Sequence, residues 1–189
     1  METGENKWID KAKAQNEKLK ELVNSLVTLS RLDEEQSPLK MKEFPISDAL
    51  SETVKSFEDF SSLNGHKLLS DIEPDLSYFG DEYAIRQLCS ILIDNAIKYA
   101  SLNSPIKISL KRIKKKTVLS VTNEAKETLD PRSLDLLFDR FYRADKSRSR
   151  ETGGFGIGLS IAKSITEGHK GKIYAKCDSE NNITFSAEL

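Results

Sequence analysis

Three side chains that together suit a nucleotide lie within a five-residue stretch, at Asn95, Lys98 and Tyr99. Steps of three and four residues bring these positions side by side on a helix. An amide oxygen can ligate Mg²⁺, a lysine can neutralise phosphate, and an aromatic ring can lie along a base. Asn95 also borders an apolar ridge, where a hydrogen bond to neighbouring backbone is the alternative role, because an unpaired buried amide costs about 1–3 kcal/mol.

Glycines gather ahead of another expected helix, in the segment Gly153-Gly154-Phe155-Gly156-Ile157-Gly158. Backbone N–H groups without a Cβ beside them can approach an anion, and a helix N-terminus adds partial positive charge. A P-loop is excluded because Leu159-Ser160 follows where Lys-Ser or Lys-Thr is required. A dinucleotide fingerprint needs other glycine spacing and a preceding strand. The segment indicates an anion-binding loop, with a flexible loop that binds nothing as the alternative.

A third segment, residues 137–143, combines phenylalanines with basic residues and runs into the charged residues 144–150. The phenylalanines can anchor the ends of a mobile segment, and the basic residues can meet phosphate. A solvated basic loop is the alternative. Nucleic acid is not an expected partner, because no recognition fold is visible and 29 basic residues against 30 acidic ones give a net charge of −1.

The hydrophobic pattern places these segments in a mixed α and β domain. Ser47 is a candidate N-cap for a helix with the core stripe Leu50, Val54, Phe57 and Phe60. A second helix carries the buried ridge Ile85, Leu88, Leu92, Ala96 and Tyr99. The expected helices span 47–64, 82–100, 131–138 and 158–167, and the expected strands span 66–72, 106–113, 117–122, 171–177 and 182–188.

A long helix over residues 5–35 is expected in front of this domain. Its apolar seam includes Leu19, Leu22, Leu26 and Leu29 at alternating three- and four-residue steps, which is typical of a helical bundle. The domain boundary falls near residues 36–43. We therefore expect an α+β fold at 37–189, with a helix at 1–36 whose exposed stripe associates with other copies or leaves the helix mobile.

The two cysteines, Cys89 and Cys177, lie far apart in apolar stretches and are expected to be free thiols in a reducing compartment. No run approaches the ~18 apolar residues of a membrane span, and no signal peptide is visible. We expect a cytoplasmic location, with any membrane anchor lying upstream in a parent protein.

Together these segments resemble the sensor histidine kinases of two-component systems, whose ATP domain belongs to the gyrase, chaperone, kinase and MutL superfamily. Residues 93–99 look like the asparagine box, 138–143 like the phenylalanine box, and 154–159 like the second glycine box. Residues 22–31 look like the second helix of the dimerisation and phosphotransfer hairpin. The resemblance implies a two-layer sandwich, a mixed sheet covered by helices.

The resemblance also implies roles for individual residues. Asn95 would ligate Mg²⁺, Lys98 would meet phosphate oxygens, Tyr99 would lie along adenine, and Arg143 would reach the γ-phosphate. Amides around Gly154, Gly156, Gly158 and Leu159 would hold the phosphate chain, under a lid at residues 140–153. The implied reaction is transfer of the γ-phosphoryl group of Mg-ATP to a histidine, for relay to a response regulator, in a protein that dimerises through the hairpin helices.

Three departures from the family pattern stand out. Residues 121–127 replace the first glycine box, and Asn123 takes the place of its aspartate, where it can still accept a hydrogen bond from the adenine amino group. Ile91 stands where the family often has another asparagine. His66 and His169, the two histidines, lack the acidic and proline neighbours of a phospho-acceptor. The chain is thus expected to bind ATP without phosphorylating itself.

Two other readings remain open. The altered first glycine box favours a nucleotide-binding regulatory module without phosphotransfer. A superfamily relative, such as an anti-sigma serine kinase or a mismatch-repair ATPase, is the other, and the leading heptad helix argues against it.

Overall fold

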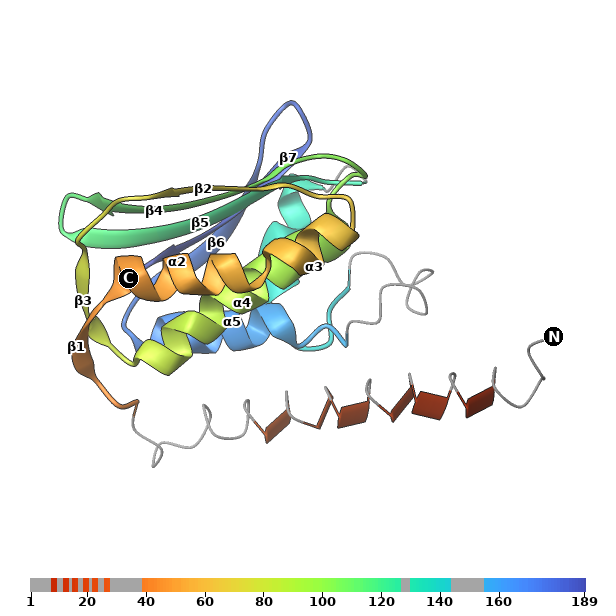
Figure 1. Ribbon diagram of the computed structural model, residues 1–189, viewed down its shortest axis with the longest axis horizontal. Helices are drawn as coiled ribbons and strands as arrows, with labels where there is room; N and C mark the ends of the chain where they lie inside the picture. Colours follow the sequence, from red (N-terminus) through yellow and green to blue (C-terminus); the bar gives the residue numbers. More distant parts are fainter. Residues whose placement is uncertain are drawn as a thin grey trace.

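A five-stranded sheet with helices on one face forms the body of the protein (Figure 1). The computed structural model describes residues 39–126, 130–143 and 155–189, together with helical residues at intervals between 8 and 27. The helices are α2 (Ile46–Ser56), α3 (Glu58–Leu63), α4 (Glu82–Tyr99), the 3₁₀ helix η1 (Pro131–Phe138) and α5 (Gly158–Gly168). The strands are β1 (Lys42–Pro45), β2 (Leu68–Ile72), β3 (Ser77–Gly80), β4 (Ile106–Ile113), β5 (Lys116–Glu124), β6 (Lys172–Cys177) and β7 (Asn182–Glu188).

The strand order β2-β4-β5-β7-β6 makes a mixed sheet. β2 runs parallel to β4, since the chain crosses over through α4 between them, and the other neighbours are antiparallel. A buried row crosses the sheet through Ile108, Val121, Phe185 and Ala175. The α+β sandwich expected from the sequence is confirmed.

The sheet's other face carries polar side chains. Ser120 and Ser186 share a hydrogen bond of 2.9 Å across β5 and β7, and Thr122 and Thr184 share one of 2.8 Å. Alternation along the strands directs these hydroxyls away from the helices. The sheet therefore has one apolar and one polar face.

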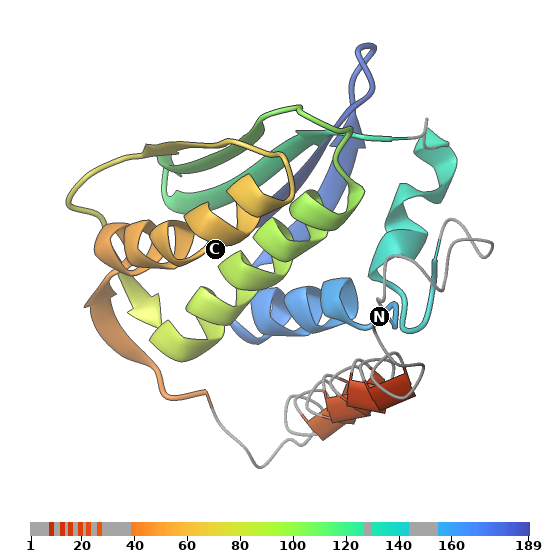
Figure 2. The ribbon, with the colours of Figure 1, turned by 45° about the vertical axis from the view of Figure 1, so that its right-hand side comes forward.

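Helix α4 is the central element of the helical layer (Figure 2). Leu88 and Leu92 on its inner face are fully buried. Asp81 caps its N-terminus by accepting a hydrogen bond from the amide of Ala84. The imidazole of His169, which follows α5, accepts a hydrogen bond from the Asp81 amide and donates one to the Ile165 carbonyl. His169 thus joins the start of α4 to the end of α5.

Some local expectations are wrong. Ser47 is not an N-cap, because α2 begins at Ile46 and the Ser47 hydroxyl bonds instead to the Glu73 carbonyl and the Leu76 amide. The helix expected over 47–64 is broken at Phe57, and this turns Phe60 outward to 45% exposure. Pairing of β1 with β3 was not anticipated either.

The described part of the N-terminal segment is helical, with Leu19, Val23, Leu26 and Val27 exposed. Leu22 on the same helix packs against the core of the domain. Among the described residues, no helix is both long and apolar enough to span a membrane. Cys89 and Cys177 are free thiols, and burial raises the pKa of Cys89 to about 12.

Candidate functional site

The C-terminal half of α4 carries Asn95, Lys98 and Tyr99 at one end of the sheet. Asn95 is partly buried, and no described residue hydrogen-bonds to its side chain. Tyr99 was expected on the buried ridge, but it lies at the last turn of α4 and is 39% exposed, so its ring is open to a ligand. Lys98 forms an ion pair with Asp94 one turn earlier, at 2.6 Å. The carboxylate of Asp94, which the sequence analysis did not single out, therefore sets the resting position of the Lys98 ammonium.

Asn123 lies at the end of β5, on the inner face of the sheet, with 1% of its surface exposed. Its amide nitrogen donates to the Glu124 carbonyl at 3.1 Å, while its Oδ1 is buried without a partner. A buried acceptor without a donor costs free energy, so a ligand that donates to it is favoured there. An exocyclic amino group would supply such a donor.

Backbone pairing holds Asn123 beside the end of α4. Ala100, directly after the helix, forms an isolated β-bridge with Ala125. The Ser101 hydroxyl and the Asn181 amide both donate to the Ala125 carbonyl, at 3.1 and 2.7 Å. Lys126 reaches back to the Lys98 carbonyl. These braces lie within or beside residues 121–127, the segment that was expected to replace a first glycine box. They could not be predicted from the sequence because they join residues distant in the chain.

The start of α5 brings the glycine segment to the same region. A Cβ on Gly158 would lie 3.5 Å from the Cγ2 of Ile91, so α5 begins against α4 one turn before Asn95. No described side chain caps this helix start. The first amides of an uncapped helix have no partner within the helix, and they attract anions. Leu159, the second residue of α5, is partly buried against the core.

The phenylalanine segment is attached to the glycine segment. Phe138 at the end of η1 packs edge-to-face on Phe185 of β7, with ring centroids 6.1 Å apart. Three residues later, the Phe141 amide donates to the Gly156 carbonyl at 2.8 Å. Arg143 follows and is partly buried. Gly154 and most of the expected lid, residues 144–153, lie outside the described residues.

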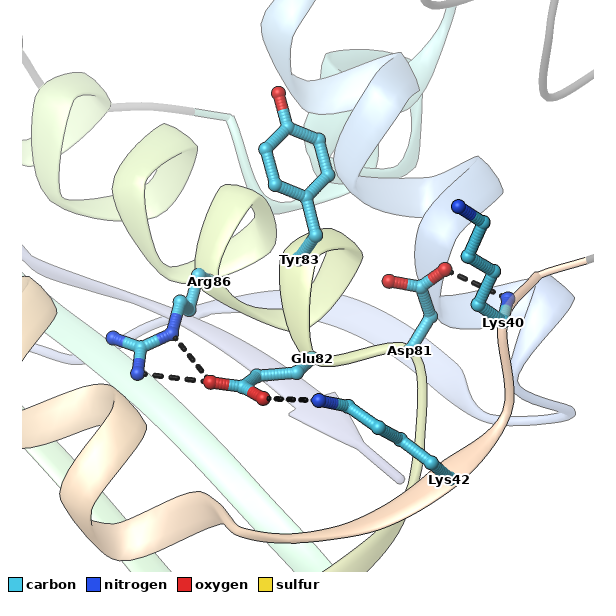
Figure 3. A pocket seen from close by; sticks show the side chains of 6 residues that line it. All are labelled: Lys40, Lys42, Asp81, Glu82, Tyr83 and Arg86. Carbon is cyan, nitrogen blue, oxygen red and sulfur yellow. Dashed lines mark hydrogen bonds and ion pairs between the residues drawn. The ribbon is translucent and has the colours of Figure 1, made fainter.

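A separate hollow opens at the other end of α4, between the helix start and residues 40–42 (Figure 3). Glu82 lies between Lys42 and Arg86 there, and hydrogen bonds from both hold its pKa below the usual range. Arg86 also reaches Glu52 and the Ala49 carbonyl. Asn95 is 13 residues further along α4, about 20 Å away. Because the charges around Glu82 pair with one another, this hollow serves to fix the chain entering the domain.

Comparison with known proteins identifies the domain. Residues 80–189 match the family model described as "Histidine kinase-, DNA gyrase B-, and HSP90-like ATPase". The chain belongs to this ATPase family. Its likeness to sensor histidine kinases is confirmed by Sensor protein DltS of Streptococcus agalactiae, which is 35% identical over 170 residues. That match covers 90% of this chain and 42% of DltS, so the chain spans less than half of that relative.

Two solved structures share the fold. Full-length ShkA in complex with AMPPNP superimposes with a TM-score of 0.82 at 18% sequence identity. The match covers 99% of this chain and 39% of the ShkA chain. Histidine kinase ThkA in complex with the response regulator protein TrrA superimposes with a TM-score of 0.78 at 22% sequence identity. The match covers 100% of this chain and 52% of the matched chain. The relatives matched in sequence are named sensor proteins and histidine kinases, which agrees with the expectation of an enzyme.

Gly156 provides a test of how the two segments are joined. Its φ is +70°, and a Cβ there would lie 2.8 Å from the Tyr142 carbonyl oxygen and 2.9 Å from the Phe141 carbonyl carbon. Gly156→Ala is therefore expected to lower the free energy of unfolding by about 1–3 kcal/mol, measured by urea denaturation.

Gly158→Ala is the matched control, because its Cβ would make only an ordinary contact with Ile91. It is expected to change stability by less than about 0.5 kcal/mol. Equal destabilisation by the two substitutions would contradict the close approach at Gly156.

Proposed function

We propose that this chain is the catalytic part of a sensor histidine kinase, which binds Mg-ATP and transfers the γ-phosphoryl group to a histidine outside the described domain. The observation that carries the proposal is the meeting of three separate segments at one end of the sheet. Asn95, Lys98 and Tyr99 lie on α4, the unpaired Oδ1 of Asn123 faces inward from β5, and the uncapped start of α5 contacts α4. Membership of the ATPase family supports the same function.

Each of the proposed site residues contacts a different part of the nucleotide. Asn123 accepts a hydrogen bond from the adenine amino group, and Tyr99 lies along the base. Lys98 leaves Asp94 and binds phosphate oxygens instead. Breaking the ion pair costs little free energy, because the side chains of Lys98 and Asp94 are 33% and 37% exposed to water. The amides of Gly156, Gly158 and Leu159, with that of Gly154 in the undescribed stretch, hold the phosphate chain. Arg143 meets the γ-phosphate, and its charge offsets the charge that develops during transfer.

Asn95 is the proposed protein ligand of Mg²⁺, through its side-chain oxygen. Among the described residues there is no group of three His, Cys, Asp or Glu side chains that could hold a metal ion. That agrees with Mg²⁺, which keeps waters and takes few protein ligands when substrate phosphates supply the rest. When bound, the ion supplies neutralising charge to the phosphates. The chain's own task is to position the nucleotide and to exclude water.

The phospho-acceptor is proposed to lie on a partner helix. His66 is 5% exposed and bonded to the Ser104 carbonyl, and His169 is 7% exposed and bonded on both ring nitrogens. Neither is available to a γ-phosphate. The alternative function, a regulatory module that binds nucleotide without transfer, is favoured by one observation: the braced backbone at Ala125 replaces the first glycine box.

The partners follow from the same proposal. A response regulator receives the phosphoryl group, as the complex of ThkA with TrrA suggests for a protein of like fold. Residues 1–36 are the second helix of a dimerising hairpin, and the exposed Leu19, Val23 and Leu26 are its contact stripe. The domain works on the cytoplasmic side of a membrane-anchored sensor.

Calorimetric titration with ATP, with and without Mg²⁺, tests the proposed metal ligand. Asn95→Ala should weaken binding about tenfold or more when Mg²⁺ is present, and much less when it is absent, because only the magnesium complex uses the amide oxygen. Asn64→Ala, an exposed asparagine that bonds to the Phe60 carbonyl, is the control. If Asn95→Ala weakened both titrations equally, the metal role would be wrong.

The role of Asn123 predicts a preference between bases. The unsubstituted chain should bind ATP about three- to tenfold more tightly than inosine triphosphate, whose base lacks the amino group. Asn123→Ala should remove that preference, mainly by weakening ATP. Competition between the two nucleotides for a fluorescent analogue measures both affinities, and a preference that survives the substitution would exclude Asn123 as the acceptor.

A phosphotransfer assay distinguishes the proposed kinase from the alternative, a regulatory module that binds nucleotide without transfer. With γ-labelled ATP the chain alone should remain unlabelled. Adding the dimerisation and phosphotransfer hairpin of a sensor histidine kinase should produce an acid-labile label on that hairpin. Arg143→Ala should slow labelling by about a hundredfold while nucleotide binding changes little. Tight magnesium-dependent ATP binding without transfer to any supplied hairpin would favour the regulatory module.

A further inference from the structure

Positive charge is concentrated at the turn between β4 and β5, although the chain as a whole is almost neutral. Residues 111–116 read Lys-Arg-Ile-Lys-Lys-Lys, five cations in six residues, in a chain of net charge −1. This segment is called the basic hairpin here. It is exposed from Arg112 to Lys116, so its charge faces solvent.

The structure neutralises the flanks of the basic hairpin and leaves its tip charged. Lys111 pairs with Asp71, and Lys116 pairs with Glu188. The Glu73 carboxylate accepts a hydrogen bond from the backbone amide of Arg112, whose guanidinium donates to the Ser77 carbonyl. No described carboxylate pairs with Lys114 or Lys115. The unpaired charge is therefore concentrated at the turn itself.

The backbone of the turn is poorly suited to lysine. Lys114 has φ +57°, the left-handed region that two-residue hairpin turns usually fill with Gly, Asn or Asp. A lysine in this conformation is strained relative to those residues. The sequence therefore carries a charge at the tip where a neutral turn residue would fold more favourably. Folding alone gives no reason for that choice.

Ile113, between these cations, is 54% exposed. Nucleic acid would use the lysines but offers little to an isoleucine beside them. A bilayer that contains anionic lipids offers phosphate headgroups to the lysines and an apolar layer just beneath to the isoleucine. We propose that the basic hairpin docks this domain on an anionic membrane surface, with Lys114 and Lys115 among the headgroups and Ile113 inserted below them.

The hairpin's position leaves the nucleotide site accessible. Lys116 and Asn123 lie at opposite ends of β5, seven residues apart, which is about 23 Å. Figure 1 accordingly places the loop between β4 and β5 at the end of the sheet away from η1. Docking therefore does not require the nucleotide to leave, and the proposal stands whether or not the chain transfers phosphate.

Co-sedimentation of the whole chain with lipid vesicles tests this docking. The chain should pellet with vesicles of mixed phosphatidylglycerol and phosphatidylcholine, and not with phosphatidylcholine alone. Binding should fall as salt is raised. The double variant Lys114→Asn/Lys115→Ser should bind roughly 25-fold more weakly, about fivefold per lysine. Ile113→Ser should weaken binding about fivefold and leave the salt dependence unchanged, because it removes only the apolar part.

Lys55→Ser/Lys67→Ser removes the same charge from exposed lysines outside the hairpin and should bind as the unsubstituted chain does. Because every variant keeps the N-terminal helix, any binding by that helix is common to all. Equal loss in the two double variants, or no loss in the hairpin variant, would overturn the proposal. So would hairpin-dependent binding to duplex DNA without binding to anionic vesicles.

Discussion

The packing of α4 against the sheet is the constraint on which the site depends. One face of the helix, through Ile85, Leu88 and Leu92, is fully buried, so the helix cannot rotate without exposing that face. Both of its ends are also fixed, by the Asp81 cap and by the bridge from Ala100 to Ala125. Asn95 and Lys98 are thereby held at one rotation and one height. Both side chains therefore start from a fixed backbone, with the Lys98 ammonium resting against Asp94.

The segment around Ala125, where the family resemblance led us to expect a first glycine box, is held in place without glycine. Ala125 is held through its backbone by Ala100, Ser101 and Asn181, and none of these bonds depends on glycine. The amide at Asn123 suits this setting better than a carboxylate would. Its nitrogen donates to the Glu124 carbonyl, a contact that would become repulsive with two oxygens. The asparagine at position 123 and the bracing of the backbone beside it are thus physically consistent with each other.

Much of the fold was predictable because hydrophobic periodicity, turn residues and helix caps depend on local structure. The bounds expected for α4, η1 and the strands β4, β6 and β7 agree with the structure to within a residue or two, and Asp81 caps α4 directly after Gly80. Errors arose where tertiary bonds decide. Ser47 is drawn away from a capping role by Glu73 and Leu76, which lie far along the chain. The same limit applies at the site, where the contact of Ile91 with Gly158 and the ion pair of Asp94 with Lys98 depend on packing and side-chain rotamers.

The paired hydroxyls on the sheet's polar face have a consequence for the architecture of a larger protein. Ser120 with Ser186, and Thr122 with Thr184, satisfy each other across the strands. These pairs link β5 to β7 through side chains as well as through the backbone ladder, so the register of the two strands does not require a neighbouring domain against this face.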